Sequence, residues 1–151
     1  MDYHERLTAP AWYWLVAIVF GVSSIVAVGF WYGPWVAAAG ALVVTAATTV
    51  LLAWAGRTDV AVNEKGLRVG PSVLEWPYVG RVEALDAEAT RELLGVKADA
   101  RAFTVEKAWL AESVVVTVDD AADPHPYWVI GSRRPAQLAD AIERRRAEVR
   151  A

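Results

Sequence analysis

The chain contains one long uncharged stretch, residues 7–56, which reads LTAPAWYWLVAIVFGVSSIVAVGFWYGPWVAAAGALVVTAATTVLLAWAG. It holds two apolar runs, residues 12–30 and 35–55, separated by the turn-like Trp31-Tyr32-Gly33-Pro34. At about 1.5 Å per residue, each run forms a helix of about 30 Å, which matches the hydrocarbon core of a bilayer. The sequence therefore predicts a transmembrane helical hairpin over residues 12–56.

Aromatic residues at the ends of both runs support this prediction, because indole and phenol rings favour the headgroup level of a membrane. The expected interface residues are Trp12, Trp14, Trp31, Tyr32, Trp35 and Trp54. Two other interpretations are less favoured. A buried soluble hairpin would keep a polar face, and a cleaved signal peptide would begin with a positive segment rather than with Asp2, Glu5 and Arg6.

The basic residues predict the orientation of the hairpin. Its turn carries no Lys or Arg, whereas Arg6 precedes the first helix and Arg57, Lys65 and Arg68 follow the second. By the positive-inside rule, both termini lie in the cytoplasm and the protein resides in the cell membrane, with residues 1–11 as a cytoplasmic N-terminal segment. Because residues 7–56 contain no ionisable group that could relay protons or ions, a transporter or channel is not favoured.

Small residues form a stripe on each predicted helix, which allows the two backbones to approach closely. The stripes consist of Ala17, Gly21 and Ser24 on the first helix and Ala37, Gly40, Ala41, Thr45 and Thr48 on the second. We interpret them as the seam within the hairpin. A dimer interface, and hence an oligomer, is the alternative.

Residues 58–151 are predicted to form one soluble domain, since the periodicity there becomes short and alternating. Strands are expected at residues 59–62, 67–69, 73–76, 79–85, 102–105, 113–118 and 127–130, with a turn at residues 63–66 and a short helix at residues 88–94. The last element should be a helix with Ser132 as its N-cap and Pro135 in its first turn. Its predicted sheet-facing residues are Leu138, Ala139, Ile142 and Val149.

The predicted fold is thus a membrane α-hairpin followed by a small α+β domain. Several short strands before one C-terminal helix suggest a curled sheet or barrel plugged by a helix, and this order resembles the pleckstrin-homology-like (PH-like) domain. An ordinary α+β sheet covered by one helix is the alternative.

Composition narrows the function. The chain has no cysteine and two histidines, which excludes thiolate chemistry and argues against a zinc site. Residues 58–130 carry 7 Lys and Arg against 13 Asp and Glu, which argues against nucleic acid as the partner. Phosphate loops, nucleophile elbows and metal motifs are missing from the sequence. We therefore expect no enzymatic activity, cofactor or metal.

Several short motifs spread over nearly the whole chain resemble one family. They are Tyr3-His4-Glu5-Arg6-Leu7 with Pro10 and the Trp12/Trp14 pair, Gly56-Arg57-Thr58, Ala89-Thr90-Arg91, Leu94-Gly95, Ala98-Asp99-Ala100-Arg101-Ala102-Phe103, Asp123-Pro124-His125-Pro126-Tyr127-Trp128 and Ser132-Arg133-Arg134-Pro135. In these motifs the chain is similar to the actinobacterial domain-of-unknown-function family 3093. The resemblance implies a two-pass actinobacterial membrane protein and supplies no activity. One departure is Lys107-Ala108-Trp109, where Arg-Pro-Trp is expected, and Lys lacks the planar fork of Arg.

Two arginine clusters are candidate binding sites. Arg133 and Arg134, at the start of the last helix, could bind phosphate or carboxylate. The favoured interpretation is that they neutralise the acidic residues of the preceding turn, Asp119, Asp120 and Asp123. Farther along, Arg144, Arg145 and Arg146, together with Arg150, could contact anionic lipid headgroups, although a solvated helix end is the favoured interpretation.

Aromatic residues form a third candidate. Tyr127 and Trp128 are adjacent in a strand and must face opposite sides, so one is expected in the core and the other on a partner-binding surface near Arg133. Trp76 and Trp109 are expected in the core. The acidic segment 119–125 is interpreted as a hairpin turn rather than a cation site, because it lacks the spacing of a calcium loop.

These features lead to one functional prediction. The protein is expected to be a membrane-anchored cytoplasmic adaptor that contacts membrane lipids through its hairpin and binds a protein partner of unknown identity through its β-rich domain. A sensor of anionic lipid headgroups that uses both arginine clusters is the alternative, and an enzyme is the least favoured class.

Overall fold

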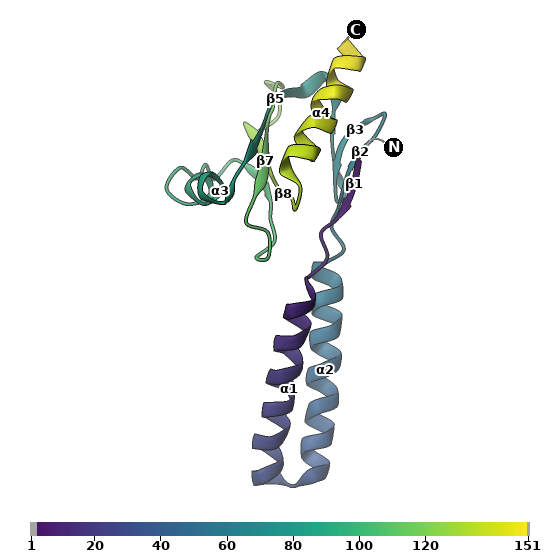
Figure 1. Ribbon diagram of the computed structural model, residues 1–151, viewed down its shortest axis with the longest axis vertical. Helices are drawn as coiled ribbons and strands as arrows, with labels where there is room; N and C mark the ends of the chain where they lie inside the picture. The colour runs from purple at the N-terminus through teal and green to yellow at the C-terminus, as the bar shows by residue number, and fades with distance from the viewer. Residues whose placement is uncertain (1–2, 151) are drawn as a thin grey trace. The chain divides into compact units, whose positions relative to one another are not determined.

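The computed structural model describes residues 3–150, apart from the side chain of Ala55 (Figure 1). The chain divides into two compact units. One is the segment Thr8–Arg57, and the other combines the residues up to Leu7 with those from Thr58 onward. The membrane hairpin is therefore an insertion into the second unit, which we call the β-domain.

Two antiparallel helices form the hairpin, α1 (Ala11–Tyr32) and α2 (Pro34–Ala55) (Figure 1). Both are long and apolar enough to span a membrane, by length and composition. The predicted four-residue turn is wrong, because the helices include all of it except Gly33. Gly33 reverses the chain alone at a φ of 87°, and Pro34 fits the first helical turn, where its missing N–H costs nothing.

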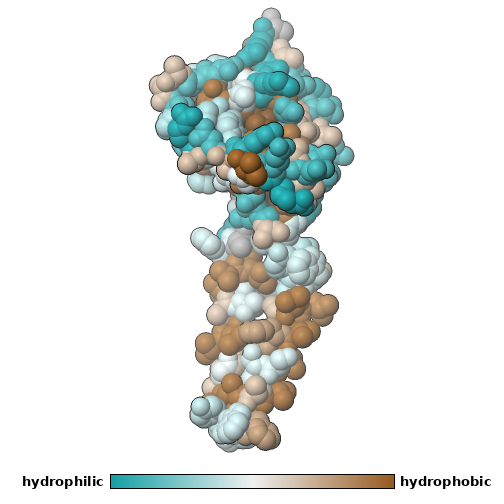
Figure 2. All heavy atoms as spheres, turned by 90° about the vertical axis from the view of Figure 1, so that its left-hand side faces the viewer, coloured by the Kyte–Doolittle hydropathy of each residue, from teal (hydrophilic) through white to brown (hydrophobic). Residues whose placement is uncertain are grey.

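Small side chains line the seam between α1 and α2, as predicted. Gly21 and Ala37 are buried there, and a Cβ on Gly29 would lie 3.2 Å from the Cβ of Ala37. Two shallow hollows along the seam are together lined by every predicted stripe residue. Figure 2 shows mostly hydrophobic side chains on the exposed surface of the hairpin, whereas the surface of the β-domain is mainly hydrophilic.

The first sheet of the β-domain consists of β1 (Tyr3–Arg6), β2 (Asp59–Val62), β3 (Gly66–Val69) and β4 (Ser72–Glu75), paired antiparallel in that order. The strand β1 differs from the expectation that residues 1–11 form a separate segment. Its inward side chains alternate with exposed ones, but the strand is short and polar, so hydropathy does not reveal it. Between β2 and β3, the predicted turn is present, and any side chain on Gly66 would clash with the Leu74 backbone.

The second sheet has the order β5-β7-β8-β6 and is antiparallel except where β6 lies parallel to β8. Its strands are β5 (Val79–Leu85), β6 (Phe103–Val105), β7 (Ser113–Val118) and β8 (Tyr127–Gly131). The sequence predicted these strands to within one residue. A 3-10 turn, η1 (Trp76–Tyr78), leads into β5, and α3 (Ala87–Leu94) follows β5. The Asp86 side chain caps α3 by accepting hydrogen bonds from two backbone amides.

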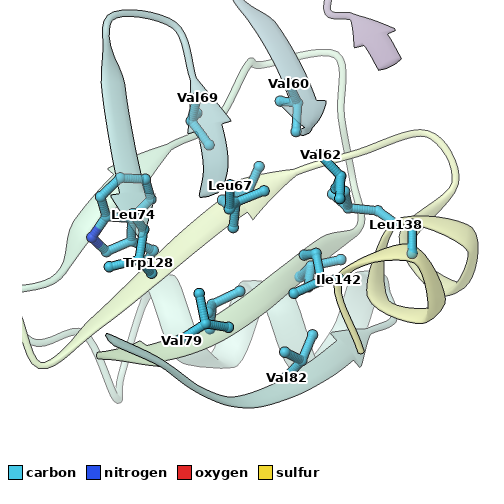
Figure 3. Close-up of a cluster of buried hydrophobic side chains, with 14 of the residues drawn as sticks. Val60, Val62, Leu67, Val69, Leu74, Val79, Val82, Trp128, Leu138 and Ile142 are labelled. Carbon is cyan, nitrogen blue, oxygen red and sulfur yellow. The ribbon is translucent and has the colours of Figure 1, made fainter. Parts of the chain in front are cut away.

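The helix α4 (Pro135–Arg150) packs on β5 and β7 and completes one hydrophobic core. Figure 3 shows side chains from both sheets and from α4 pointing toward one another; the labelled ones are Val60, Val62, Leu67, Val69, Leu74, Val79, Val82, Trp128, Leu138 and Ile142. Two predictions about α4 are wrong. Ser132 lies three residues before the helix and does not cap it, and Val149 is 51% exposed near the C-terminal end of the helix, while Ala141 takes a core position instead.

Candidate interaction surfaces

The start of α4 is held by a buried carboxylate from the other end of the chain. Glu5, on β1, is only 4% exposed. Its Oε1 accepts the backbone N–H of Arg133 at 2.9 Å, and its Oε2 accepts the hydroxyls of Ser132 at 2.6 Å and of Tyr3 at 2.8 Å. Three donors satisfy the carboxylate, which is what a buried charge requires. We call Tyr3, Glu5, Ser132 and the Arg133 amide the Glu5 cluster.

The Glu5 cluster changes the acidity of Tyr3. Burial of the phenol, the largest cause, raises the pKa of Tyr3 to about 12, and the hydrogen bond to Glu5 acts in the same direction. The contact with Ser132 acts in the opposite direction and is outweighed. The Tyr3 phenol therefore stays protonated and remains a donor to Glu5 throughout the neutral pH range.

The Arg133 and Arg134 side chains lie on the surface beside this cluster. Arg133 Nη1 donates to the backbone carbonyl of Arg6 at 3.3 Å, and Arg6 Nε lies 3.8 Å from Asp59 Oδ1. The Arg134 amide donates to Ser132 Oγ at 3.0 Å, which leaves its guanidinium exposed. We call Arg6, Arg133 and Arg134 the tether arginines, because Arg6 lies five residues before the first apolar helix.

The tether arginines do not neutralise the acidic turn, contrary to the favoured interpretation. That turn precedes β8, whereas Arg133 follows it, and the intervening five-residue strand spans about 16 Å. The turn itself connects β7 and β8 as a hairpin, as predicted. For the same reason Tyr127, at the first position of β8, lies away from Arg133, so the expected joint surface of Tyr127 and Arg133 is wrong.

The second arginine cluster mostly serves the fold. Arg146 Nη1 donates to the carbonyl of Gly80, and Arg150 Nη2 donates to that of Val79 at 3.2 Å. These carbonyls lie where the register of β5 against β7 shifts, so strand pairing leaves them available. Arg145 donates to Glu148 Oε2 at 2.7 Å, and Arg144 is exposed. Neither the lipid interpretation nor a merely solvated helix end describes Arg146 and Arg150.

Trp128 and Tyr127 face opposite sides of β8, as predicted. Trp128 is buried in the core, with its ring centroid 4.4 Å from that of Phe103 on β6, and Tyr127 is half-buried. Trp76 is also a core residue, and its indole N–H donates to the carbonyl of Asn63 at 3.0 Å. The core prediction holds only in part for Trp109, which is half-buried.

Two short acidic–basic pairs flank these rings. Asp99 accepts two bonds from the Arg101 guanidinium, at 3.1 and 2.8 Å, and its side-chain bonds to Arg101, the largest cause, lower the pKa of Asp99. Asp123 Oδ1 accepts the backbone amide and the Nδ1 of His125, both at 2.8 Å. The backbone bond, the largest cause, lowers the pKa of the Asp123 carboxyl.

These residues form one surface. The Phe103 ring contacts His125 edge-on at 5.8 Å, and the charge of Arg101 reaches Tyr127. We call Asp99, Arg101, Phe103, Asp123, His125 and Tyr127 the Arg101 surface. The segments that contribute it are two of the motifs quoted above, residues 98–103 and 123–128, which lie apart in sequence and meet through the pairing of Phe103 with Trp128. Within residues 3–150, no group of three or more His, Asp or Glu side chains could hold a metal ion.

Sequence reasoning missed Glu5, Asp99, Arg101 and His125. A signal exists for Glu5, since it is an acidic residue at an inward position between Tyr3 and Leu7 in an alternating segment. For Asp99 and Arg101 the spacing of two in a turn sequence favours a local ion pair. Their proximity to Tyr127 depends on the parallel pairing of β6 with β8, which local patterns do not encode.

A helical hairpin long enough to span a membrane, inserted into a two-sheet domain closed by a C-terminal helix, defines the class of this protein. The family model described as "Protein of unknown function (DUF3093)" matches residues 2–142. The chain belongs to this family, as its motifs predicted. Neither the curated proteins nor the solved structures contain a significant match to it.

Proposed function

We propose that the protein is a membrane-anchored interaction module, whose hairpin anchors it in the cell membrane and whose β-domain binds a protein partner through the Arg101 surface. In this proposal the β-domain binds its partner without catalysis and without a cofactor or metal. The acidic balance of residues 58–130 argues against nucleic acid as that partner.

The pairing of β1 with β2 supports an anchor with both ends on one side of a membrane. Leu7 donates its amide to the carbonyl of Thr58 at 3.0 Å, so the entry and exit of the hairpin are neighbours in one sheet. A chain that leaves and re-enters the same sheet must cross a membrane an even number of times. With an uncharged hairpin turn and Arg6 and Arg57 at the other end, the positive-inside rule favours the cytoplasm for the β-domain.

The observation that carries the partner-binding proposal is the rigidity of the Arg101 surface. Interfaces draw most of their binding energy from Tyr, Trp and Arg, and this surface combines Tyr127 with Arg101 above the buried ring of Trp128. The forked contact with Asp99 fixes the guanidinium of Arg101 before any partner arrives. Such preorganisation lowers the entropy cost of association.

We also propose that the β-domain is PH-like. Support comes from two four-stranded sheets that share one core and from the C-terminal helix that packs on it. The long insertion between the first two strands fits such a fold, because a loop between neighbouring antiparallel strands tolerates added residues.

Purification of the full-length protein from native membranes, with mass spectrometry of the proteins retained at raised salt, tests this function. We compare the wild type with Arg101→Ala and with Arg68→Ala, a matched control in which an exposed arginine of the first sheet is removed. A partner recovered in near-equal amount with the wild type and the control, but lost from Arg101→Ala, is the expected result. Equal recovery with all three proteins would exclude the Arg101 surface as the binding site.

A second candidate function, contact with anionic lipid headgroups, now rests on the tether arginines alone. The two arginine clusters lie at opposite ends of the 16-residue α4, about 24 Å apart, so they cannot serve one headgroup.

A further inference from the structure

Covalent connectivity keeps the tether arginines close to the membrane surface if the hairpin is anchored as proposed. Thr58 lies three residues after Ala55, the last residue of α2, so it lies within about 11 Å of that helix end. Arg6 pairs with Asp59 in the adjacent position of the ladder and lies five residues before Ala11, within about 18 Å. These bounds hold for any placement of the two units, and the headgroup layer is itself about 5–8 Å thick.

The tether arginines are held ready for contact at this position. The backbone at Arg133 is fixed by the buried Glu5 carboxylate, and its guanidinium uses Nη1 on the Arg6 carbonyl. A guanidinium has five N–H donors, so one such bond leaves others to bind phosphate oxygens. The only charge partner within 4 Å that the structure gives Arg6 is Asp59, at 3.8 Å, which is a weak pair.

We propose that Arg6, Arg133 and Arg134 form a phosphate-binding surface that rests on anionic lipid headgroups beside the hairpin. The proposal deepens the second candidate function above and rests on the proposed membrane anchor. Lipid is the favoured source of phosphate because the tether holds these side chains at headgroup distance continuously, whereas a soluble phosphate must bind from solution. The contact would fix the orientation of the β-domain relative to the bilayer.

A fluorescent label near Arg133 tests this proposal in the full chain. Since the chain has no cysteine, a single Ala136→Cys substitution at an exposed position of the first turn of α4 gives one labelling site. The labelled protein is reconstituted into vesicles of phosphatidylcholine alone, or with about a third phosphatidylglycerol, each with a trace of a headgroup nitroxide quencher. We expect stronger quenching in the anionic vesicles, and a decline of that increment as salt rises.

Variants separate specific contact from mere proximity. Arg133→Gln should lower the ratio of docked to undocked protein roughly fivefold, since one basic residue near an anionic surface contributes that factor. Arg133→Lys, which keeps the charge, should restore part of the increment. Arg144→Gln, at the other end of α4, is the matched control and should leave quenching unchanged. None of these changes touches the Glu5 carboxylate or the amide that it holds.

Three outcomes would overturn the proposal. The first is equal quenching in neutral and anionic vesicles, and the second is an equal loss with Arg133→Gln and Arg144→Gln. The third is abolition of the increment by inorganic phosphate at constant ionic strength, which would assign the surface to a soluble phosphate. Failure of the anchor is distinguished beforehand, because an unanchored protein would be extracted from the vesicles by alkaline carbonate.

Discussion

The two ends of α4 show how the same residue type can have opposite roles. At its start, the backbone of Arg133 is bound by Glu5 while the guanidinium lies at the surface. At its end, the guanidiniums of Arg146 and Arg150 do the binding, and they donate to the carbonyls of Gly80 and Val79. A run of arginines therefore says little until the carbonyls and carboxylates around it are known.

Deletion of β1 should break the start of α4 with the largest effect. Residues 58–151 alone lack Leu7, which is fully buried, and lack the acceptor for Ser132 and Arg133. We expect them to remain unfolded, because the loss approaches the total stability of a small domain, about 5–15 kcal/mol. Residues 1–7 joined to residues 58–151 by an Asn-Gly turn should fold, since Leu7 and Thr58 already pair and Asn-Gly suits a two-residue hairpin. Near-UV circular dichroism of both chains checks this, and a folded residue 58–151 chain would refute it.

Glu5→Ala tests the same end with one residue. Three donors lose their acceptor, which should lower the free energy of unfolding by about 3 kcal/mol. Glu5→Gln keeps the shape and one acceptor oxygen and should lose less. His4→Ala, an exposed neighbour on β1, is the control. Urea unfolding of the joined chain, followed by tryptophan fluorescence, gives these values, and an equal loss in Glu5→Ala and His4→Ala would count against the Glu5 cluster.

Alkaline pH offers a gentler way to loosen the start of α4. The pKa of Tyr3 is raised to about 12 in the folded protein, above the value of about 10 for an unfolded tyrosine. Because the folded state holds this proton more tightly, its contribution is complete below pH 10 and is lost as pH rises toward 12. Unfolding midpoints of the joined chain should therefore fall across this window, and Tyr3→Phe should flatten the slope. An unchanged slope in Tyr3→Phe would assign it to other groups.

At the other end of α4, smaller effects are expected. Arg146→Ala and Arg150→Ala each remove a hydrogen bond at the edge of the β5 bulge and should each cost about 1 kcal/mol. Arg144→Ala, an exposed neighbour, should change the unfolding midpoint by less than about 0.5 kcal/mol in free energy. Urea titration of the three variants would decide the matter. Three equal values would mean that Arg146 and Arg150 do not hold the helix.

Local patterns predicted most of the fold. The hairpin and the strands β2, β5 and β7 follow from hydropathy, alternation and β-branched residues, which act within a few neighbours. The strand β1 was not predicted because its partner lies beyond the whole hairpin, with Tyr3 opposite Val62. A four-residue polar strand has no local signature strong enough to reveal such a pairing.

The candidate surfaces were predicted less well for a similar reason. Sequence reasoning selected the arginines and Tyr127 by residue type, and these residues do lie partly or fully at the surface. What it grouped together, the structure separates: β8 lies between Tyr127 and Arg133, and α4 lies between Arg133 and Arg146. The Arg101 surface depends on the parallel contact of β6 with β8, and the carbonyl partners of Arg146 depend on a register shift in β5.

The insertion of the hairpin between β1 and β2 also sets a timetable for synthesis. A ribosome adds about 5–20 residues per second, so β1 waits several seconds, while both apolar helices are made, before β2 exists to pair with it. The amide that Glu5 will bind is made 128 positions later still. The β-domain therefore cannot close ahead of its own anchor, and membrane insertion has a head start over folding in every molecule made.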